Sequence, residues 1–543
     1  MKTFALAFVS AFLSSAGETL YAAQNSNALN PCEVRVLQED VPMAGNRFGA
    51  TIAWNQTTLA VAAPEYPRGE RVGVVYLYAR NGDNWFLIAT LSPDLVLSSG
   101  RTPDFGASMV WDDDILYVAA PAGNESSEGV VYRYQDDGSG HWLALSPLLA
   151  PDPSGFSGFG SELLLHEDQL FVADVFNSGV VGGGGAVYVF DRGSDDWVFR
   201  EKLLASDAAR TAQFGSGLAA ENDQFVVGAT LAEQAYIFQR QGDGSWLETQ
   251  VLASPSSSLQ TFFGSSVAMG DGHLFIGAYR TSITLSSDGA VEVFDLQGST
   301  WSYAQSLCDS DPVSGGNFGF GVTYAEGRLF VGTTAGPVDN FGPGRLIIFE
   351  QSSNLWLEST RLSKTILNAI DRFSNDVVVD GDLLLVGAPG PTVVATAPGF
   401  VQSYSLGGLA CGDFSADVPA LPLASGGTQN LTLDAGPEHA GDRFVVAGST
   451  SGVSRGIHID SLRVPLDFDA YTRFLLGGGG GMQLSPKTGL LDAQGRASVT
   501  LNLAPRNATH LERPSFFHAY ILFDKATGKL DYTSVPVSLV FDE

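Results

Sequence analysis

Basic residues are scarce in this sequence. Lysine and arginine together number 29, against 59 aspartates and glutamates, so the formal net charge is −30. A surface of this sign repels the phosphate backbone, and we therefore expect no nucleic-acid partner. Charged residues make up only 16% of the chain and hydrophobic residues 44%, a composition that excludes an intrinsically disordered protein.

Long hydrophobic runs are also missing. No segment reaches the roughly 18 consecutive apolar residues that a transmembrane helix requires, so we expect no membrane-spanning segment. The apolar run 4–13 follows Lys2 and precedes small residues at 14–16, an order typical of a secretory signal peptide. We interpret residues 1–23 as this signal peptide, with cleavage between residues 16 and 23, and expect a secreted or cell-surface-associated protein. A buried first strand is the alternative interpretation of the same run.

Motifs for metal binding and phosphate binding are absent in linear form. The seven histidines form no HxH or HxxxH pair, and no P-loop lysine follows the glycine-rich segment 182–185. We therefore expect no metal, no cofactor and no catalytic residue, and the sequence identifies no ligand-binding residue. Residues from distant segments can still meet in space, so an enzyme site stays open as an alternative.

A repeat of 49 to 57 residues runs through most of the sequence. Each copy begins with a phenylalanine, which is followed by glycine in six copies and by Ser374 in the seventh. Sixteen residues after this phenylalanine, a short triplet such as "AAP" or "GAP" ends. An aromatic segment such as "GVVYLYAR" follows, and in six copies a tryptophan-led segment comes next. This pattern indicates four short strands per copy. The marker phenylalanines are Phe48, Phe105, Phe159, Phe214, Phe263, Phe318 and Phe373.

Four strands in a period of about 50 residues are typical of a β-propeller. The phenylalanine–glycine pairs and the triplets resemble the FG-GAP repeats of the integrin α-subunit propeller, and more closely the bacterial-type variant of that repeat. The resemblance covers roughly residues 33–406 and implies a seven-bladed β-propeller. We expect the phenylalanines to fill the space between blades and the glycines to let backbones approach closely.

Seven blades need seven outer strands, but only six tryptophan-led strands follow the first phenylalanine. The segment 32–40 aligns with the missing one, so we expect a propeller over residues 32–411 that is closed by its N-terminal strand. The same alignment places Cys32 and Cys411 on adjacent positions of one blade, and we expect a disulfide bond between them in a secreted protein. Cys308 is expected to be a small buried hydrophobic residue on a fourth strand.

FG-GAP propellers often bind calcium in a DxDxDG-type hairpin between the first two strands of a blade. In this sequence the sixteen-residue spacing leaves room only for a tight turn. We therefore interpret Asp112, Asp113 and Asp114 as turn residues rather than metal ligands. After residue 411 the repeat ends, and alternating apolar runs with glycine-containing turns predict a smaller β-sandwich-like domain over residues 412–543. The whole chain is thus expected to be all-β.

The resemblance and the lack of a catalytic motif favour a secreted, non-enzymatic binding or adhesion protein. Its expected partner is an extracellular protein or glycan, met by the variable loops that follow the triplets on one face of the propeller. We expect a monomer. Two alternatives stay open: a structural component of a surface or matrix, and a propeller enzyme that acts on an extracellular polysaccharide.

Overall fold

The computed structural model is built of β-strands, as the sequence predicts, and forms two compact units. Among the described residues, one unit contains residues 36–403, and the other contains residues 32–35 and 404–542. The structure describes residues 32–38, 46–64, 73–81, 84–93, 104–121, 128–138, 140–152, 157–177, 183–194, 196–207, 212–256, 260–334, 344–352, 354–363, 372–390, 399–406, 414–416, 420–422, 425–435, 439–449, 457–459, 462–464, 482–503, 516–525, 528, 530–533 and 537–542.

Six four-stranded antiparallel sheets contain strands in simple sequence order, one sheet for each of the first six repeats. The first two sheets are β2 (Ile52–Trp54), β3 (Thr58–Ala63), β4 (Val74–Asn81) and β5 (Asn84–Leu91), then β6 (Met109–Asp112), β7 (Ile115–Ala120), β8 (Val130–Asp136) and β9 (Trp142–Leu149). The next two are β10 (Phe159–His166), β11 (Gln169–Asp174), β12 (Ala186–Arg192) and β13 (Trp197–Leu203), then β14 (Phe214–Glu221), β15 (Gln224–Ala229), β16 (Gln234–Arg240) and β17 (Trp246–Ala253). The fifth and sixth are β18 (Phe263–Gly270), β19 (His273–Ala278), β20 (Ala290–Gln297) and β21 (Thr300–Leu307), then β22 (Val322–Ala325), β23 (Arg328–Thr333), β24 (Arg345–Ser352) and β25 (Leu355–Ser363).

The seventh sheet combines both ends of the repeat region. It contains β26 (Asp376–Asp380), β27 (Leu383–Ala388), β28 (Phe400–Ser405) and, hydrogen-bonded to β28, the N-terminal strand β1 (Cys32–Leu37). A non-covalent pairing therefore takes the place of a chain connection in this sheet. The side chain of Cys32 and all of Cys411 lie outside the described residues, so the expected disulfide stays a prediction, and so do the domain boundaries at residues 411 and 412.

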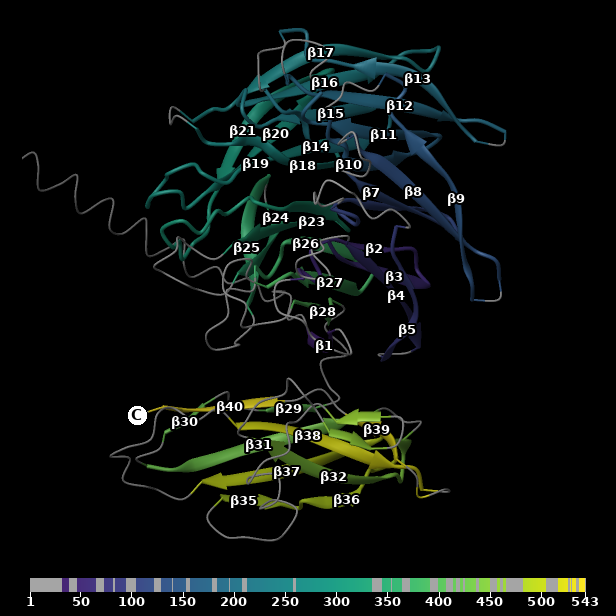
Figure 1. Cartoon of the computed structure of the whole chain (residues 1–543). Helices are drawn as coiled ribbons and strands as arrows, with labels where there is room; N and C mark the ends of the chain where they lie inside the picture. The colour runs from purple at the N-terminus through teal and green to yellow at the C-terminus, as the bar shows by residue number, and fades with distance from the viewer. Residues whose placement is uncertain are drawn as a thin grey trace, which may run out of the picture. The chain divides into compact units, whose positions relative to one another are not determined.

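The seven sheets form a closed ring (Figure 1). The first strands of consecutive sheets lie side by side around the centre, and β26 of the last sheet lies beside β2 of the first. This arrangement confirms the seven-bladed β-propeller that the repeat predicts. The first strands, which begin just after the repeat phenylalanines, therefore surround the axis.

The repeat phenylalanines are part of the core, and all seven are 0% exposed. The ring of Phe105 lies 5.5 Å from that of Tyr132 and 6.1 Å from that of Tyr134, both on the third strand of its own blade. The same cluster includes Ala62 and Val75 of the preceding blade. The ring thus fills the space between two blades, where its burial stabilises their contact by roughly 2 kcal/mol.

The second unit contains three further sheets within the described residues. In β31 the leucines Leu431 and Leu433 are 0% exposed while Asn430 and Thr432, which alternate with them, are exposed, so one face of this sheet is buried. The β-sandwich-like domain stays a prediction. The first sheet contains β29 (Phe414–Ala416), β31 (Gly427–Asp434), β37 (Arg496–Leu503) and β35 (Met482–Ser485); the second contains β30 (Ala420–Pro422), β40 (Val537–Asp542), β38 (Phe516–Phe523), β32 (Arg443–Ser449), β36 (Thr488–Leu490) and β39 (Leu530–Thr533); the third contains β33 (Ile457–Ile459) and β34 (Leu462–Val464).

Candidate functional site

A cavity of about 750 Å³ lies at the centre of the propeller. The first strands of all seven blades line it, together with the segments just before them. One repeat position recurs in every blade: the third residue after the marker phenylalanine faces this cavity. We call these residues the axial ring, and they are Thr51, Ser108, Glu162, Gly217, Ser266, Gly321 and Asp376.

A bulge in the first strand explains why this position lines the cavity. In β18, three residues between Phe263 and Val267 oppose the single residue Gly277 of β19. The first of the three, Gly264, has a φ of +89°, a conformation that residues with a Cβ rarely adopt. A bulge of this kind redirects the following side chain, and here it directs Ser266 toward the axis.

Four side chains of the axial ring bind the backbone of the next blade. Their hydrogen bonds connect first strands around the ring, so these side chains act as ties between blades. Thr51 Oγ1 donates to the carbonyl of Ala107 (3.1 Å), Ser108 Oγ accepts from the N–H of Leu163 (3.0 Å), Ser266 Oγ donates to the carbonyl of Gly319 (2.9 Å), and Asp376 Oδ2 accepts from the N–H of Ile52 (2.8 Å).

Glu162 is the exception in the axial ring. Its carboxyl group forms no hydrogen bond or ion pair with any residue that the structure describes, although it lines the cavity. Burial inside the propeller, and next the negative charge of Asp376, raise the pKa of Glu162 to about 8. Glu162 is therefore largely protonated at neutral pH, which makes it a proton donor.

Asp376 is the second carboxyl group of the axial ring. Burial raises its pKa to about 6, and the N–H groups of Ile52 and Val377, each 2.8 Å from a carboxylate oxygen, oppose this rise because they stabilise the ionised form. Asp376 is thus largely ionised at pH 7. Two carboxyl groups whose environments separate their pKa values can divide the roles of acid and base between them.

No linear motif predicts this pair, because Glu162 and Asp376 lie more than 200 residues apart. A detectable signal exists once the repeats are aligned. The third position after the marker phenylalanine is Thr, Ser or Gly in five copies and acidic in only the third and seventh. A charged residue at a position that is otherwise small or uncharged marks the cavity carboxylates.

Other residues singled out in the sequence have different outcomes. Asp113 occupies the turn after β6 with a φ of +50°. Asp112 is the last residue of β6 rather than part of the turn; it is 6% exposed and forms an ion pair with Arg192 of the next blade. Cys308 is exposed rather than buried, because it follows the last, inward-facing residue of β21, Leu307. Most of the loops expected to bind a partner lie outside the described residues.

No group of three or more histidine, cysteine or acidic side chains that could hold a metal ion is found in the part of the chain that the structure describes. In the same part, no helix has the length and apolar character that crossing a membrane requires.

Comparisons with known proteins identify the repeat and reveal fold likenesses. A family model described as "FG-GAP repeat" matches residues 197–242. No curated protein sequence matches the chain. Among solved structures, the periplasmic gluconolactonase of Pseudomonas aeruginosa is similar, with 14% identity and a TM-score of 0.41 over 61% of this chain and 86% of that one.

Two further solved structures are similar, each titled a "putative 6-phosphogluconolactonase". The protein from Bacteroides fragilis has 12% identity and a TM-score of 0.42, over 61% of this chain and 87% of that one. The protein from Bacteroides uniformis has 13% identity and a TM-score of 0.42, over 64% of this chain and 100% of that one. All three titles name enzymes, whereas the sequence led us to expect a non-enzymatic protein.

Proposed function

Because the chain is a seven-bladed β-propeller built of FG-GAP repeats, we propose that it carries an active site in its central cavity. The proposed activity is acid–base hydrolysis of glycosidic bonds in an extracellular polysaccharide. The observation that supports it is the pair of cavity carboxyl groups, Glu162 and Asp376, with pKa values raised to about 8 and about 6. One protonated and one ionised carboxyl group are the catalytic pair of most glycoside hydrolases.

The two groups have distinct roles in this reaction. Glu162 donates its proton to the oxygen of the glycosidic bond, which breaks between that oxygen and the anomeric carbon, and the leaving sugar departs as an alcohol. Asp376 accepts a proton from the water molecule whose oxygen adds to the anomeric carbon. One water is consumed, and proton exchange with solvent restores both carboxyl groups.

The surroundings of Glu162 suit it to this role. The hydroxyl groups of Thr51, Ser108 and Ser266 are engaged with backbone atoms of neighbouring blades, whereas the Glu162 carboxyl has no partner among the described residues. It is therefore the polar group of the axial ring that a substrate can contact without displacing a tie between blades. The cavity volume of about 750 Å³ lies within the roughly 300–1,000 Å³ typical of ligand pockets.

We further propose that the protein acts outside the cell as a monomer, and that a polysaccharide is its partner. FG-GAP repeats are typical of extracellular proteins, which supports this location. The expected signal peptide at residues 1–23 lies outside the described residues. In an oxidising compartment, the proposed Cys32–Cys411 disulfide would add a covalent link at the seventh blade.

The activity is tested by release of reducing sugar from a panel of polysaccharides with the full-length mature protein. Glu162→Gln and Asp376→Asn are each expected to lower kcat by about 10²–10⁴-fold with little change in KM, because each removes a proton-transfer group. For the wild type, kcat/KM is expected to fall below about pH 6, where Asp376 is protonated, and above about pH 8, where Glu162 is ionised.

Glu292→Gln is the matched control. Glu292 in β20 is also a buried carboxyl group, 2% exposed, and burial raises its pKa to about 7, but it does not line the cavity. Its variant should keep wild-type activity. Full activity of Glu162→Gln, or the absence of turnover on every polysaccharide of the panel, would contradict the proposal.

A further inference from the structure

Three aromatic side chains line the central cavity on one side, between the fifth and sixth blades. The ring of Tyr279 lies 5.2 Å from that of Phe262 and 5.4 Å from that of Phe320. None of the three is fully buried, and Phe320 is 36% exposed. Their surfaces are therefore accessible from the cavity that holds the two carboxyl groups.

Each of these aromatic residues departs from the repeat. Phe262 precedes the marker phenylalanine, where the other blades have Arg, Asp, Gly, Gln or Asn. Tyr279 ends the triplet, where the others have Pro, Val or Thr, and Phe320 stands two residues after the marker, where the others have Ala, Ser or Asn. Packing of the propeller does not require a large ring at these positions, because the other blades pack without one. The three aromatic rings that depart from the repeat nevertheless lie together in the folded propeller.

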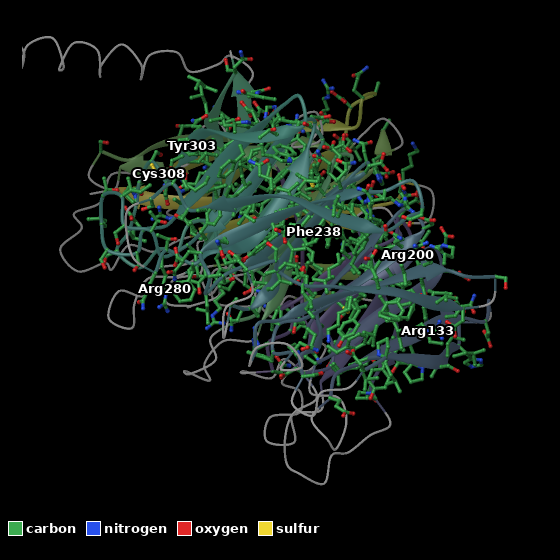
Figure 2. All side chains as sticks on the ribbon, turned by 90° about the horizontal axis from the view of Figure 1, so that it is seen from above. Arg133, Arg200, Phe238, Arg280, Tyr303 and Cys308 are labelled. Carbon is green, nitrogen blue, oxygen red and sulfur yellow. The ribbon has the colours of Figure 1, made fainter. Side chains whose placement is uncertain are left out.

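Arg280 lies at the surface of the propeller (Figure 2), and its guanidinium group packs against two of these rings. Its guanidinium carbon is 4.6 Å from the centre of the Phe262 ring and 6.0 Å from that of Tyr279. The side chain is exposed and forms no ion pair or hydrogen bond with any residue that the structure describes, although the chain has 59 acidic residues. In contrast, Arg192 and Arg240 are each paired with a carboxylate at 2.6 Å.

The backbone holds Phe262 in an unfavourable conformation. Its φ is +59°, in the left-handed region that residues with a side chain rarely adopt. The carboxylate of Glu233 stabilises this conformation, because it accepts hydrogen bonds from the N–H of Phe262, at 3.0 Å, and from the hydroxyl of Thr261. The residue before the marker phenylalanine also has a positive φ in five other blades, from +48° at Arg372 to +62° at Arg47, so this conformation belongs to the repeat, and the aromatic side chain is what distinguishes the fifth blade.

We propose that Phe262, Tyr279, Phe320 and Arg280 form a subsite for a negatively charged sugar residue, and we call them the aromatic–arginine subsite. The inference rests on the proposed function and specifies its substrate as an acidic polysaccharide. The apolar face of a sugar ring packs on aromatic rings. A guanidinium group stacked on those rings binds a carboxylate or a sulfate with two hydrogen bonds.

The overall charge makes a local cation necessary for such a substrate. With a formal net charge of −30, the protein repels a polyanion at a distance. Arg280, which has no carboxylate partner among the described residues, supplies the attraction beside the aromatic rings that line the cavity. Carboxylate sugars and sulfated sugars present the same chemistry to it, so the experiment must distinguish the two.

The test is calorimetric binding to the full-length Glu162→Gln protein, in which turnover is suppressed. The probes are tetragalacturonate, a sulfated galactan tetrasaccharide and neutral cellotetraose. One of the two anionic probes is expected to bind at least tenfold more tightly than cellotetraose, with an affinity that falls as salt is added. Adding Arg280→Gln is expected to remove that preference and to leave the affinity for cellotetraose unchanged.

Arg80→Gln is the matched control, because Arg80 also lies over an aromatic ring, 5.8 Å from the centre of Trp85, but on the outer strands of the first blade. The Glu162→Gln protein that also carries Arg80→Gln should bind all three probes as tightly as the Glu162→Gln protein does. Equal binding of anionic and neutral probes, or an unchanged preference in Arg280→Gln, would overturn the subsite. If the wild type cleaves a neutral polysaccharide and Arg280→Gln changes neither binding nor turnover, the proposed function is retained and the subsite is rejected. If binding of an anionic probe depends on Arg280 but no polysaccharide is cleaved, the subsite is retained and the proposed function is rejected.

Discussion

At the scale of single residues, every blade requires the same unusual backbone conformation directly after its marker phenylalanine. The residue that follows has a positive φ in all seven blades, from +74° at Ser374 to +102° at Gly215. Ser374 has the only side chain in this set, and its hydroxyl donates to the carbonyl of Arg345 at 2.7 Å. That hydrogen bond offsets part of the strain that a Cβ introduces.

Gly264→Ala is expected to lower the free energy of unfolding by about 2–4 kcal/mol. A Cβ at this position would lie 2.6 Å from the carbonyl oxygen of Gln234 and 3.0 Å from the N of Ala229, and backbone atoms cannot move aside easily. Denaturant unfolding measures the change. Gly327 is the control, because its φ is also positive, +72°, but no atom lies within 4 Å of the added Cβ. Gly327→Ala should cost only about 1 kcal/mol, and equal losses in the two variants would show that close approach is not the reason for the glycine.

At the scale of strands, ion pairs between blades add to the apolar contacts. Asp112 at the end of β6 accepts two hydrogen bonds of 2.6 Å from Arg192 at the end of β12. The guanidinium carbon of Arg192 also lies 5.0 Å from the centre of the Trp197 ring. The second and third blades are therefore joined by a bidentate ion pair whose carboxylate is nearly buried.

Asp112→Asn is expected to destabilise the propeller by about 1–2 kcal/mol, because the amide cannot replace both charge-assisted hydrogen bonds. The estimate is modest since Arg192 is 44% exposed and water screens the pair. Thermal or urea unfolding provides the measurement. Asp114→Asn, in the same hairpin, removes an exposed carboxylate that accepts one hydrogen bond from Gln135 and should change stability by less than about 0.5 kcal/mol. A loss in Asp112→Asn no larger than in Asp114→Asn would contradict the role of the ion pair.

At the scale of the whole molecule, the fold follows from the repeat but the site does not. Seven phenylalanines at a regular spacing predict the number of blades and the buried position of each ring. The cavity exists only because the ring closes through β1 and β28, and closure brings Glu162 of the third blade and Asp376 of the seventh to a common axis. No linear motif predicts that these two carboxyl groups share the cavity, and none predicts that Arg280 packs on the rings around it.

The central claim is that this closed ring holds Glu162 protonated at neutral pH, and infrared difference titration tests it without a substrate. The spectrum of the wild type minus that of Glu162→Gln isolates the C=O band of the protonated Glu162 carboxyl group. The account predicts that this band persists at pH 7, disappears with a midpoint near pH 8, and shifts to a lower midpoint in Asp376→Asn, where one neighbouring negative charge is gone. A midpoint near 4.5, the ordinary value for a glutamate, would contradict the account.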